Sequence, residues 1–392
     1  MITYLLLGII AGTTAGLIPG IHTNNITLIV FLTPLFGNNA TVFVLSMITT
    51  QSFVDFIPTI FIGAASENSF EGILPGHKMF MQGKAHEAIM LTVFGGIIAT
   101  IISILVFPFF IKSIEFYSTN FEIIIPMILI FSIITLILTE NTKQKKLIAI
   151  FVIIVATTQG ILFKDQIFPL ISGYFGISTL INSTIKKQIS QKQETEFEIH
   201  NDKIKDALTG IIGGAIVAFV PGIGNNLAAA IIRLFRQKIR TKNYLVLLGS
   251  INTSNFIFSF PVLLFLSKTR NGAMIFLKER ILITEQTILI GCATILISSG
   301  IAGIITIIIS KKMSKNSNNS KFIKLQQNKI IEKIIIILIT ILVLFFNGLI
   351  GLIALIFSTA LGLITINTKT KRSNCLAFLI IPVLFFYLYQ LI

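Results

Sequence analysis

The chain has 392 residues, of which 54% are hydrophobic and only 12% are charged. Soluble globular domains carry about 25% charged residues, so this composition excludes an ordinary water-soluble protein. The formal net charge is +15. The Lys and Arg residues sit in short segments between apolar runs, which is typical of cytoplasmic loops of membrane proteins and not of a nucleic-acid-binding surface. Cys292 and Cys375 lie in apolar surroundings, which favours buried positions over a disulfide or a metal pair.

Apolar runs recur along the whole chain, each near the length of about 20 residues that a helix needs to cross a bilayer. In the first half we expect spans near 41–64, 88–111, 121–139, 147–163 and 166–182. The runs are continuous, which predicts helices and not a β-barrel. The sequence thus predicts an all-α, multi-pass integral protein of the plasma membrane, with about ten transmembrane helices in the lipid bilayer.

The first apolar run is interrupted by Pro19-Gly20. No basic residue precedes the run and no small-residue cleavage site ends it, so we do not expect a cleaved secretory signal. Pro and Gly break a helix and leave backbone groups that need new partners inside a bilayer. Thr23, Asn24 and Asn25 follow the break and are placed to supply them.

The span near 41–64 carries a polar cluster that includes Gln51 and Ser52. Asp55 follows and is the clearest ionisable residue inside an expected span, which makes it a candidate for taking up a proton or binding a coupling cation. A boundary position beside a counter-charge is the alternative.

Four basic residues occupy the following loop: His77, Lys78, Lys84 and His86. We interpret them as ordinary residues of a cytoplasmic loop. A vestibule that attracts anions is the alternative.

A charged linker, 186–206, divides the chain into two predicted transmembrane repeats, 1–185 and 207–392. The second repeat begins with a matching break, Pro221-Gly222, followed by Gly224, Asn225 and Asn226. The prolines of the two breaks are 221 − 19 = 202 residues apart. A second broken helix at the equivalent point indicates a transporter's binding site.

A second polar cluster also recurs, with Asn252, Ser254 and Asn255 in place of Gln51 and Ser52. The prolines that follow the two clusters are 261 − 58 = 203 residues apart. Two features at nearly constant spacing predict an internal duplication. At this spacing the counterpart of Asp55 is Phe258, so the acidic group is not duplicated.

Loop charge predicts the orientation of the chain. The segments rich in Lys and Arg are expected in the cytoplasm, namely Lys143–Lys146, Lys186–Lys205, Arg233–Lys242, Lys311–Lys333 and Lys369–Arg372. The second break then has cytoplasmic flanks on both sides, and its arms are too short to span, which predicts a re-entrant helical hairpin. An odd number of spans between the two hairpins makes the halves inverted repeats. The alternative is about twelve full crossings with parallel repeats.

The two breaks and the two polar clusters together predict a substrate site near the membrane midplane. The start of a half-helix favours a carboxylate, Asn can donate to an anion or coordinate a cation, and unwound carbonyls can hold sodium. The candidate residues are Pro19, Gly20, Thr23, Asn24, Asn25, Gln51, Ser52, Pro221, Gly222, Gly224, Asn225, Asn226, Asn252, Ser254 and Asn255, with Asp55 for the coupling ion. A structural kink with asparagines that satisfy loose backbone is the alternative for each break.

Three segments carry a resemblance to a known family: Gly12–His22, Gly214–Gly224 and Gly72–Ala88. They resemble the TctA family, the large membrane permease of tripartite tricarboxylate transporters, and its archaeal stand-alone relatives. His22 replaces a glycine usual in that family. The resemblance implies cation-driven uptake of organic anions, and in bacteria a small membrane subunit and an extracellular binding protein as partners.

We therefore expect a secondary transporter that moves organic anions such as di- or tricarboxylates by alternating access, coupled to sodium or protons. The motifs of intramembrane hydrolases are missing from the sequence, so we do not expect an enzyme, a metal site or a cofactor. A channel is the alternative, because re-entrant loops also line pores.

Overall fold

The computed structural model describes residues 1–18, 23, 26–27, 39–61, 73–117, 121–185, 191–196, 203–220, 224–236, 239–266, 272–275, 277, 284–318 and 330–390. Six of the predicted site residues lie outside the described residues: Pro19, Gly20, Asn24, Asn25, Pro221 and Gly222. The other candidates lie within them.

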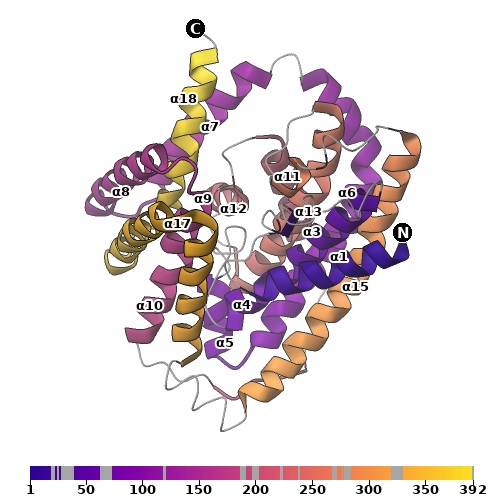
Figure 1. Ribbon diagram of the computed structural model, residues 1–392, viewed down its shortest axis with the longest axis horizontal. Helices are drawn as coiled ribbons and strands as arrows, with labels where there is room; N and C mark the ends of the chain where they lie inside the picture. The colour runs from indigo at the N-terminus through magenta and orange to yellow at the C-terminus, as the bar shows by residue number, and fades with distance from the viewer. Residues whose placement is uncertain are drawn as a thin grey trace.

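The described residues fold into helices joined by short connections, in agreement with the all-α prediction (Figure 1). In chain order the longer elements are α1 (Ile2–Leu17), α3 (Ala40–Val54), α6 (Ala85–Tyr117), α7 (Phe121–Leu138), α8 (Lys143–Leu162), α11 (Ile204–Phe219), α12 (Asn225–Phe235), α13 (Thr241–Leu266), α15 (Glu285–Ser317), α17 (Ile330–Asn367) and α18 (Ala377–Gln390). The shorter ones are α4 (Phe56–Phe61), η3 (Ile73–His77), α5 (Lys78–Met81), α9 (Ile167–Ile171), η4 (Ser172–Ile177), α10 (Ser178–Ile185), α14 (Gly272–Ile275) and η6 (Arg372–Leu376).

Seven helices in the described part of the chain are long and apolar enough to cross a membrane. Three match spans expected in the first half, at 40–61, 85–112 and 143–162, and four lie in the second half. The spans expected near 121–139 and 166–182 correspond to shorter apolar helices, Ile125–Leu138 and Ile167–Asn182. A multi-pass helical membrane protein is confirmed, while the total of about ten spans stays a prediction.

The helices form two groups. The central bundle contains α1, α3, α6, α11, α13 and α15, and the peripheral bundle contains α7 to α10, α17 and α18 (Figure 1). Helix α12 lies between them and contacts α11 and α13 on one side and α7 on the other. The second break therefore leads into the helix that joins the two bundles.

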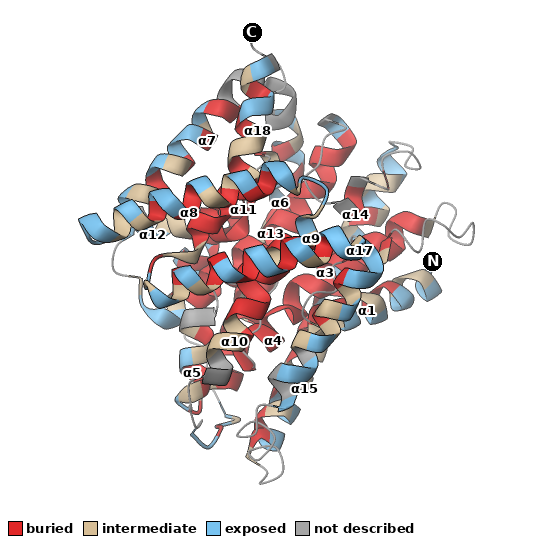
Figure 2. Cartoon of the chain, turned by 60° about the vertical axis from the view of Figure 1, so that its left-hand side comes forward, coloured by how far each residue is buried: buried red, intermediate tan, exposed pale blue. Residues whose placement is uncertain are grey.

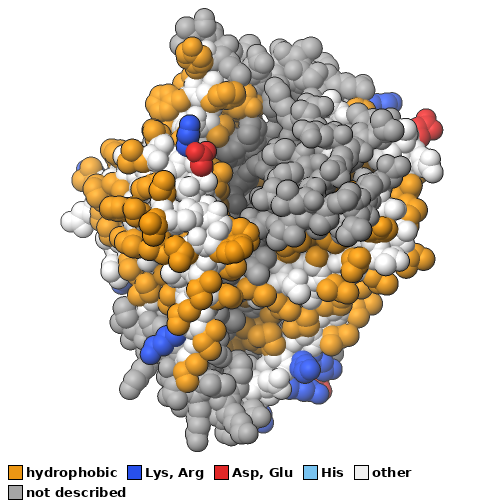
Figure 3. Space-filling view, viewed as in Figure 1, with side chains coloured by type: hydrophobic (Ala, Val, Ile, Leu, Met, Phe, Trp, Pro, Cys, Tyr) orange, Lys and Arg blue, Asp and Glu red, His pale blue; other side chains and the backbone are white. Residues whose placement is uncertain are grey.

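Burial separates polar from apolar helices. The spans at Ala40–Phe61 and Thr241–Phe265, which contain α3 and α13, each include an 18-residue apolar stretch that is entirely buried (Figure 2). They carry the two polar clusters, and polar side chains are unfavourable against lipid, so these helices occupy the centre. The outward faces of α8, α15 and α17 are hydrophobic (Figure 3), with side chains such as Phe345 and Leu349 exposed for contact with lipid acyl chains.

Glycines allow α1 to lie along α3 and α11 to lie along α13. A Cβ atom on Gly12 would lie 2.2 Å from the carbonyl oxygen of Met47, and one on Gly214 would lie 2.0 Å from Ser254 Oγ. Only hydrogen fits at such a distance, so small residues set the close approach of these backbones. The two halves thus use the same packing device.

The order of these contacts shows that each pair is parallel. Along α1, Gly8, Gly12 and Gly16 meet Ser46, Thr50 and Val54 in ascending order. Along α11, Gly210 and Gly214 meet Ser250 and Ser254. In the second pair, α12 is the helix that connects the end of α11 to the start of α13.

Corresponding helices of the two halves run antiparallel. Between α6 and α15, His86 Nδ1 lies 2.7 Å from Ser310 Oγ, while Thr100 Oγ1 donates to Ser299 Oγ at 3.1 Å. Between α3 and α13, Ser52 Oγ lies 3.4 Å from Thr253 Oγ1. Leu45, nearer the start of α3, and Phe260, nearer the end of α13, both lie beside Gly291. The two contacts run in opposite order along the helices, so α3 and α13 are antiparallel.

The peripheral bundle also exchanges contacts between the halves. Helix α18 packs on α7 and α8, and the α9–η4–α10 segment packs on α17. Glu140, after α7, accepts hydrogen bonds from the Lys371 backbone N–H at 2.7 Å and from Asn374 Nδ2 at 3.0 Å. Helix α17 is broken at Gly348, which has a left-handed φ of 63° and separates two arms.

Candidate functional site

The two predicted polar clusters meet where α3 crosses α13. Gln51, Ser52 and Asn252 are each no more than 1% exposed, and Asn225 at the start of α12 is 2% exposed. Asn226 and Thr23 are also buried. Residues from both halves therefore contribute to one buried polar region where α3 crosses α13.

A hydrogen-bond relay joins α12, α13 and α3. Asn225 Nδ2 donates to Asn252 Oδ1 at 2.8 Å, and Asn252 Nδ2 donates to the backbone carbonyl of Ser52 at 2.9 Å. The Ser52 carbonyl can only accept, so it fixes the orientation of the Asn252 amide and, through it, that of Asn225. The second break is thereby tied to the first half of the chain.

The relay leaves part of the region unsatisfied. Asn225 Oδ1, both amide atoms of Gln51 and Thr23 Oγ1 are buried without a hydrogen-bond partner among the described residues. Each such group destabilises the protein by about 1–3 kcal/mol, so a set of them needs a physical reason. A bound ligand that supplies the partners is one such reason.

The N-terminus of α12 completes the polar region. Gly224 is the N-cap and has no side chain to offer to the first backbone N–H groups, and Asn225 and Asn226 are the first two helical residues. The asparagines thus lie just inside the helix and not at its cap. The start of α12 therefore presents N–H groups and the positive end of a helix dipole.

Two other candidates serve packing as well. Ser254 donates to the Ser250 carbonyl at 2.6 Å and lies against Gly214 of α11, so its hydroxyl faces the glycine contact. Asn255 is 9% exposed, and its carbonyl accepts a hydrogen bond from Ser259 Oγ. Thr253, which approaches Ser52 across the helix crossing, was not among the candidates although it lies in the same cluster.

Asp55 is buried at the junction between α3 and α4. Asp55 is only 2% exposed. Its backbone N–H donates to the Gln51 carbonyl at 2.9 Å, and its backbone carbonyl accepts a hydrogen bond from Thr59 Oγ1. The acid thus lies one helical turn beyond Gln51, inside the protein. Its role with a coupling ion stays a prediction.

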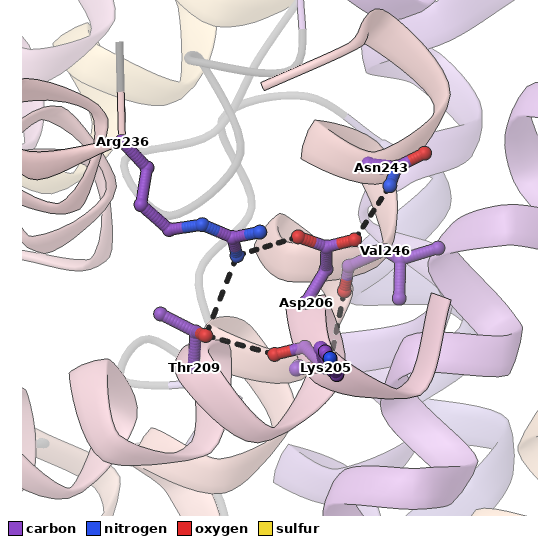
Figure 4. A network of polar contacts seen from close by, with 7 residues as sticks. Lys205, Asp206, Thr209, Arg236, Asn243 and Val246 are labelled. Carbon is purple, nitrogen blue, oxygen red and sulfur yellow. Dashed lines mark hydrogen bonds and ion pairs between the residues drawn. The ribbon is translucent and has the colours of Figure 1, made fainter. Parts of the chain in front are cut away.

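The base of the second break carries a polar network that sequence reasoning missed (Figure 4). Asp206 near the start of α11 accepts from Arg236 Nη1, after α12, and from Asn243 Nδ2 in α13, both at 2.6 Å. The start of α11 and the end of α12 therefore lie together, as in a hairpin. The sequence did carry a signal for this network, because an acid, Asp206, precedes the break and an arginine, Arg236, follows it.

Two of the four basic loop residues, His77 and His86, make contacts within the protein, whereas Lys78 is exposed. His77 Nδ1 lies 3.0 Å from the Ile60 carbonyl oxygen, and its ring stacks on Phe80. Burial lowers the pKa of His77, and the hydrogen bond to Ile60 opposes this in part. His86 contacts Ser310. These contacts favour a structural role for both histidines over a vestibule for anions.

Together these features define a multi-pass helical membrane protein with a buried polar crossing between its halves. Residues 2–377 match the model of the Tripartite tricarboxylate transporter TctA family. The chain belongs to this family, as its motifs predicted, and is therefore a transporter component.

A similar protein is known from an archaeon. The chain is 30% identical over 400 residues to the Uncharacterized protein MJ1079 of Methanocaldococcus jannaschii, and the match covers 98% of each chain. No solved structure matches the chain.

Proposed function

We propose that this protein is a secondary transporter that moves organic anions, such as di- or tricarboxylates, across the plasma membrane by alternating access coupled to a cation gradient. The relay from Asn225 through Asn252 to Ser52 carries this proposal, because it joins the start of α12 to the first half of the chain in a buried polar region. A site shared between repeats can be opened to either face when they move against each other. Catalysis plays no part in this proposal.

The arrangement of helices supports inverted repeats. Helices α3 and α13 run antiparallel, as do α6 and α15. The pairing of Asp206 with Arg236 supports a hairpin that enters and leaves the membrane by the same face. Two halves of opposite direction around one site provide the two alternative access paths that such transporters need.

The start of α12 supports an anionic substrate. Its first N–H groups and the positive end of its dipole favour a carboxylate, and the surrounding region is buried. Some members of the family work with a small membrane subunit and an extracellular binding protein. We propose the same two kinds of partner for this chain. A channel is the second candidate, since a re-entrant hairpin can also line a pore.

Uptake by purified protein in liposomes tests the proposal. We expect uptake of radiolabelled citrate or succinate to saturate and to require an inward sodium or proton gradient. The Asn252→Ala variant breaks both bonds of the relay and should reduce uptake at least about 10-fold. Uptake that rises linearly with substrate and ignores both gradients would favour the channel.

A further inference from the structure

We propose that Asn225 and Gln51 hold a metal cation such as sodium, in direct contact with the substrate carboxylate, so that cation and anion share one site between the two halves. This inference rests on the proposed function and specifies its coupling ion. The initial expectation gave the coupling ion to Asp55 and left the asparagines able either to donate to the anion or to coordinate a cation.

The relay determines what Asn225 can bind. Its Nδ2 donates to Asn252 Oδ1, whose own amide is fixed by the Ser52 carbonyl. Only Oδ1 of Asn225 remains, buried and without a hydrogen-bond partner in the part of the chain that the structure describes. An ionised carboxylate has only acceptor oxygens and cannot satisfy another acceptor. The ligand at Asn225 Oδ1 is therefore a cation or a donor group.

Gln51 needs two partners of opposite kind. Gln51 is 1% exposed, and neither Nε2 nor Oε1 has a hydrogen-bond partner among the residues that the structure describes. Whichever way the amide is turned, it offers one donor and one acceptor. A carboxylate with a bound cation supplies both partners, because the carboxylate accepts from Nε2 while the cation contacts Oε1.

The surroundings favour a metal ion over a proton. Neutral amide oxygens are good ligands for hard cations, and helix breaks in transporters hold sodium in this way. Amide oxygens do not take up protons at physiological pH, so the site as built does not serve proton coupling. The buried carboxyl group of Asp55 follows Gln51 by one turn of helix on the same side and offers a further oxygen ligand type.

Direct contact makes the two binding events interdependent. The start of α12 favours the carboxylate, and Asn225 is the first residue of that helix, so the cation at its Oδ1 lies next to the anion. Unit charges about 4 Å apart at a protein surface attract strongly enough to raise affinity about 100-fold or more. We therefore expect sodium to tighten anion binding, and the anion to tighten sodium binding by the same factor.

The first experiment tests cation binding in the absence of any carboxylate substrate. Purified protein is titrated with sodium chloride against choline chloride at constant ionic strength, and thermal unfolding is followed by circular dichroism, since the chain has no tryptophan. A ligand that binds the folded state raises the unfolding temperature. We expect a saturable rise in the wild type and at least a 10-fold weaker sodium dependence in Asn225→Ala and Gln51→Ala.

Asn347→Ala is the matched control. Asn347 Oδ1 is also buried and has no hydrogen-bond partner within the described ranges, but it lies beside the break of α17 in the peripheral bundle. This variant should keep the wild-type sodium response. Absence of a sodium response in the wild type, or a full response in Asn225→Ala, would overturn the cation site.

A fixed positive charge tests the direct contact. In Gln51→Lys the ammonium group replaces the cation beside the carboxylate, so binding of labelled citrate should no longer require sodium, whereas wild-type binding does. A Gln51→Lys protein that unfolds at the wild-type temperature but still needs sodium to bind citrate contradicts the contact.

The outcomes separate this inference from the proposed function. Saturable uptake of citrate that depends on protons and not on sodium would leave the transporter proposal in place and remove the sodium site. A sodium response that is lost in Asn225→Ala, in a protein that transports neither citrate nor succinate, would keep the site and remove the proposed substrate class.

Discussion

The pairs α1–α3 and α11–α13 are packed alike but differ in their charged groups. Both use glycines against hydroxyl-bearing helices, as Gly12 does at Thr50 and Gly214 does at Ser254. Among the described residues, an acid holds the base of the second pair alone, namely Asp206. At the spacing of 202, its counterpart in α1 is Tyr4. The comparison shows that backbone packing is matched between the halves while the charged contacts are not.

The largest expected effect comes from filling the glycine contacts. Gly12→Val and Gly214→Val each place methyl groups where even a Cβ atom lies within 2.2 Å of an oxygen. We expect each to destabilise the protein by at least about 3 kcal/mol, because neither backbone can move apart without opening the bundle. Thermal unfolding by circular dichroism and size-exclusion profiles measure the effect.

Gly300→Val is the control for these variants. A Cβ atom at Gly300 meets nothing within 4 Å among the described residues, so this variant should behave as the wild type. Similar losses for Gly12→Val and Gly214→Val would support matched packing. A loss confined to one of them would show that the two pairs are not equivalent.

A smaller effect is expected at the base of the second pair. Asp206→Ala removes the acceptor for both Arg236 and Asn243. We expect a loss of about 1–3 kcal/mol, at the lower end because the Arg236 side chain is 42% exposed. Tyr4→Phe, at the matching position of α1, should change the unfolding temperature much less. Equal effects would remove the asymmetry between the pairs.

The smallest effect concerns pH at His77, which lies outside the spans. Burial lowers the folded-state pKa of His77 below its usual value of 6.5. The unfolded state therefore binds a proton more readily, so stability is present above about pH 6.5 and falls as the solution becomes more acidic. Unfolding temperatures of the wild type should drop between pH 7 and pH 5 more than those of His77→Gln. Parallel profiles would contradict a buried neutral histidine.

The buried position of many candidate-site residues could be predicted from sequence, because burial of a polar residue follows from the apolar composition around it. Polar residues such as Gln51 and Asn252 inside apolar runs must be buried among other helices, since lipid offers them no partner. What each amide binds could not be predicted. That depends on the Ser52 carbonyl meeting Asn252 across a helix crossing, between residues 200 apart in the chain.

Register is a second point at which sequence was insufficient. A spacing of 203 made Phe258 the counterpart of Asp55. The glycine contacts instead relate Ser46 to Ser250 and Thr50 to Ser254, a spacing of 204, which makes Ser259 the counterpart. An offset of one residue rotates a helical position by about 100°, so only the packed helices reveal which residues occupy matching places.

The sequence by itself determined that this protein is a helical membrane protein with two breaks, because hydropathy and Pro-Gly pairs act locally. Tertiary structure alone decided that α3 and α13 cross at their polar clusters. It also decided that the Asn225 amide uses its Nδ2 donor on Asn252, which leaves its Oδ1 acceptor for a ligand. The physical reason is that hydrogen-bond direction is set by the partner, and here the partner belongs to the other half of the chain.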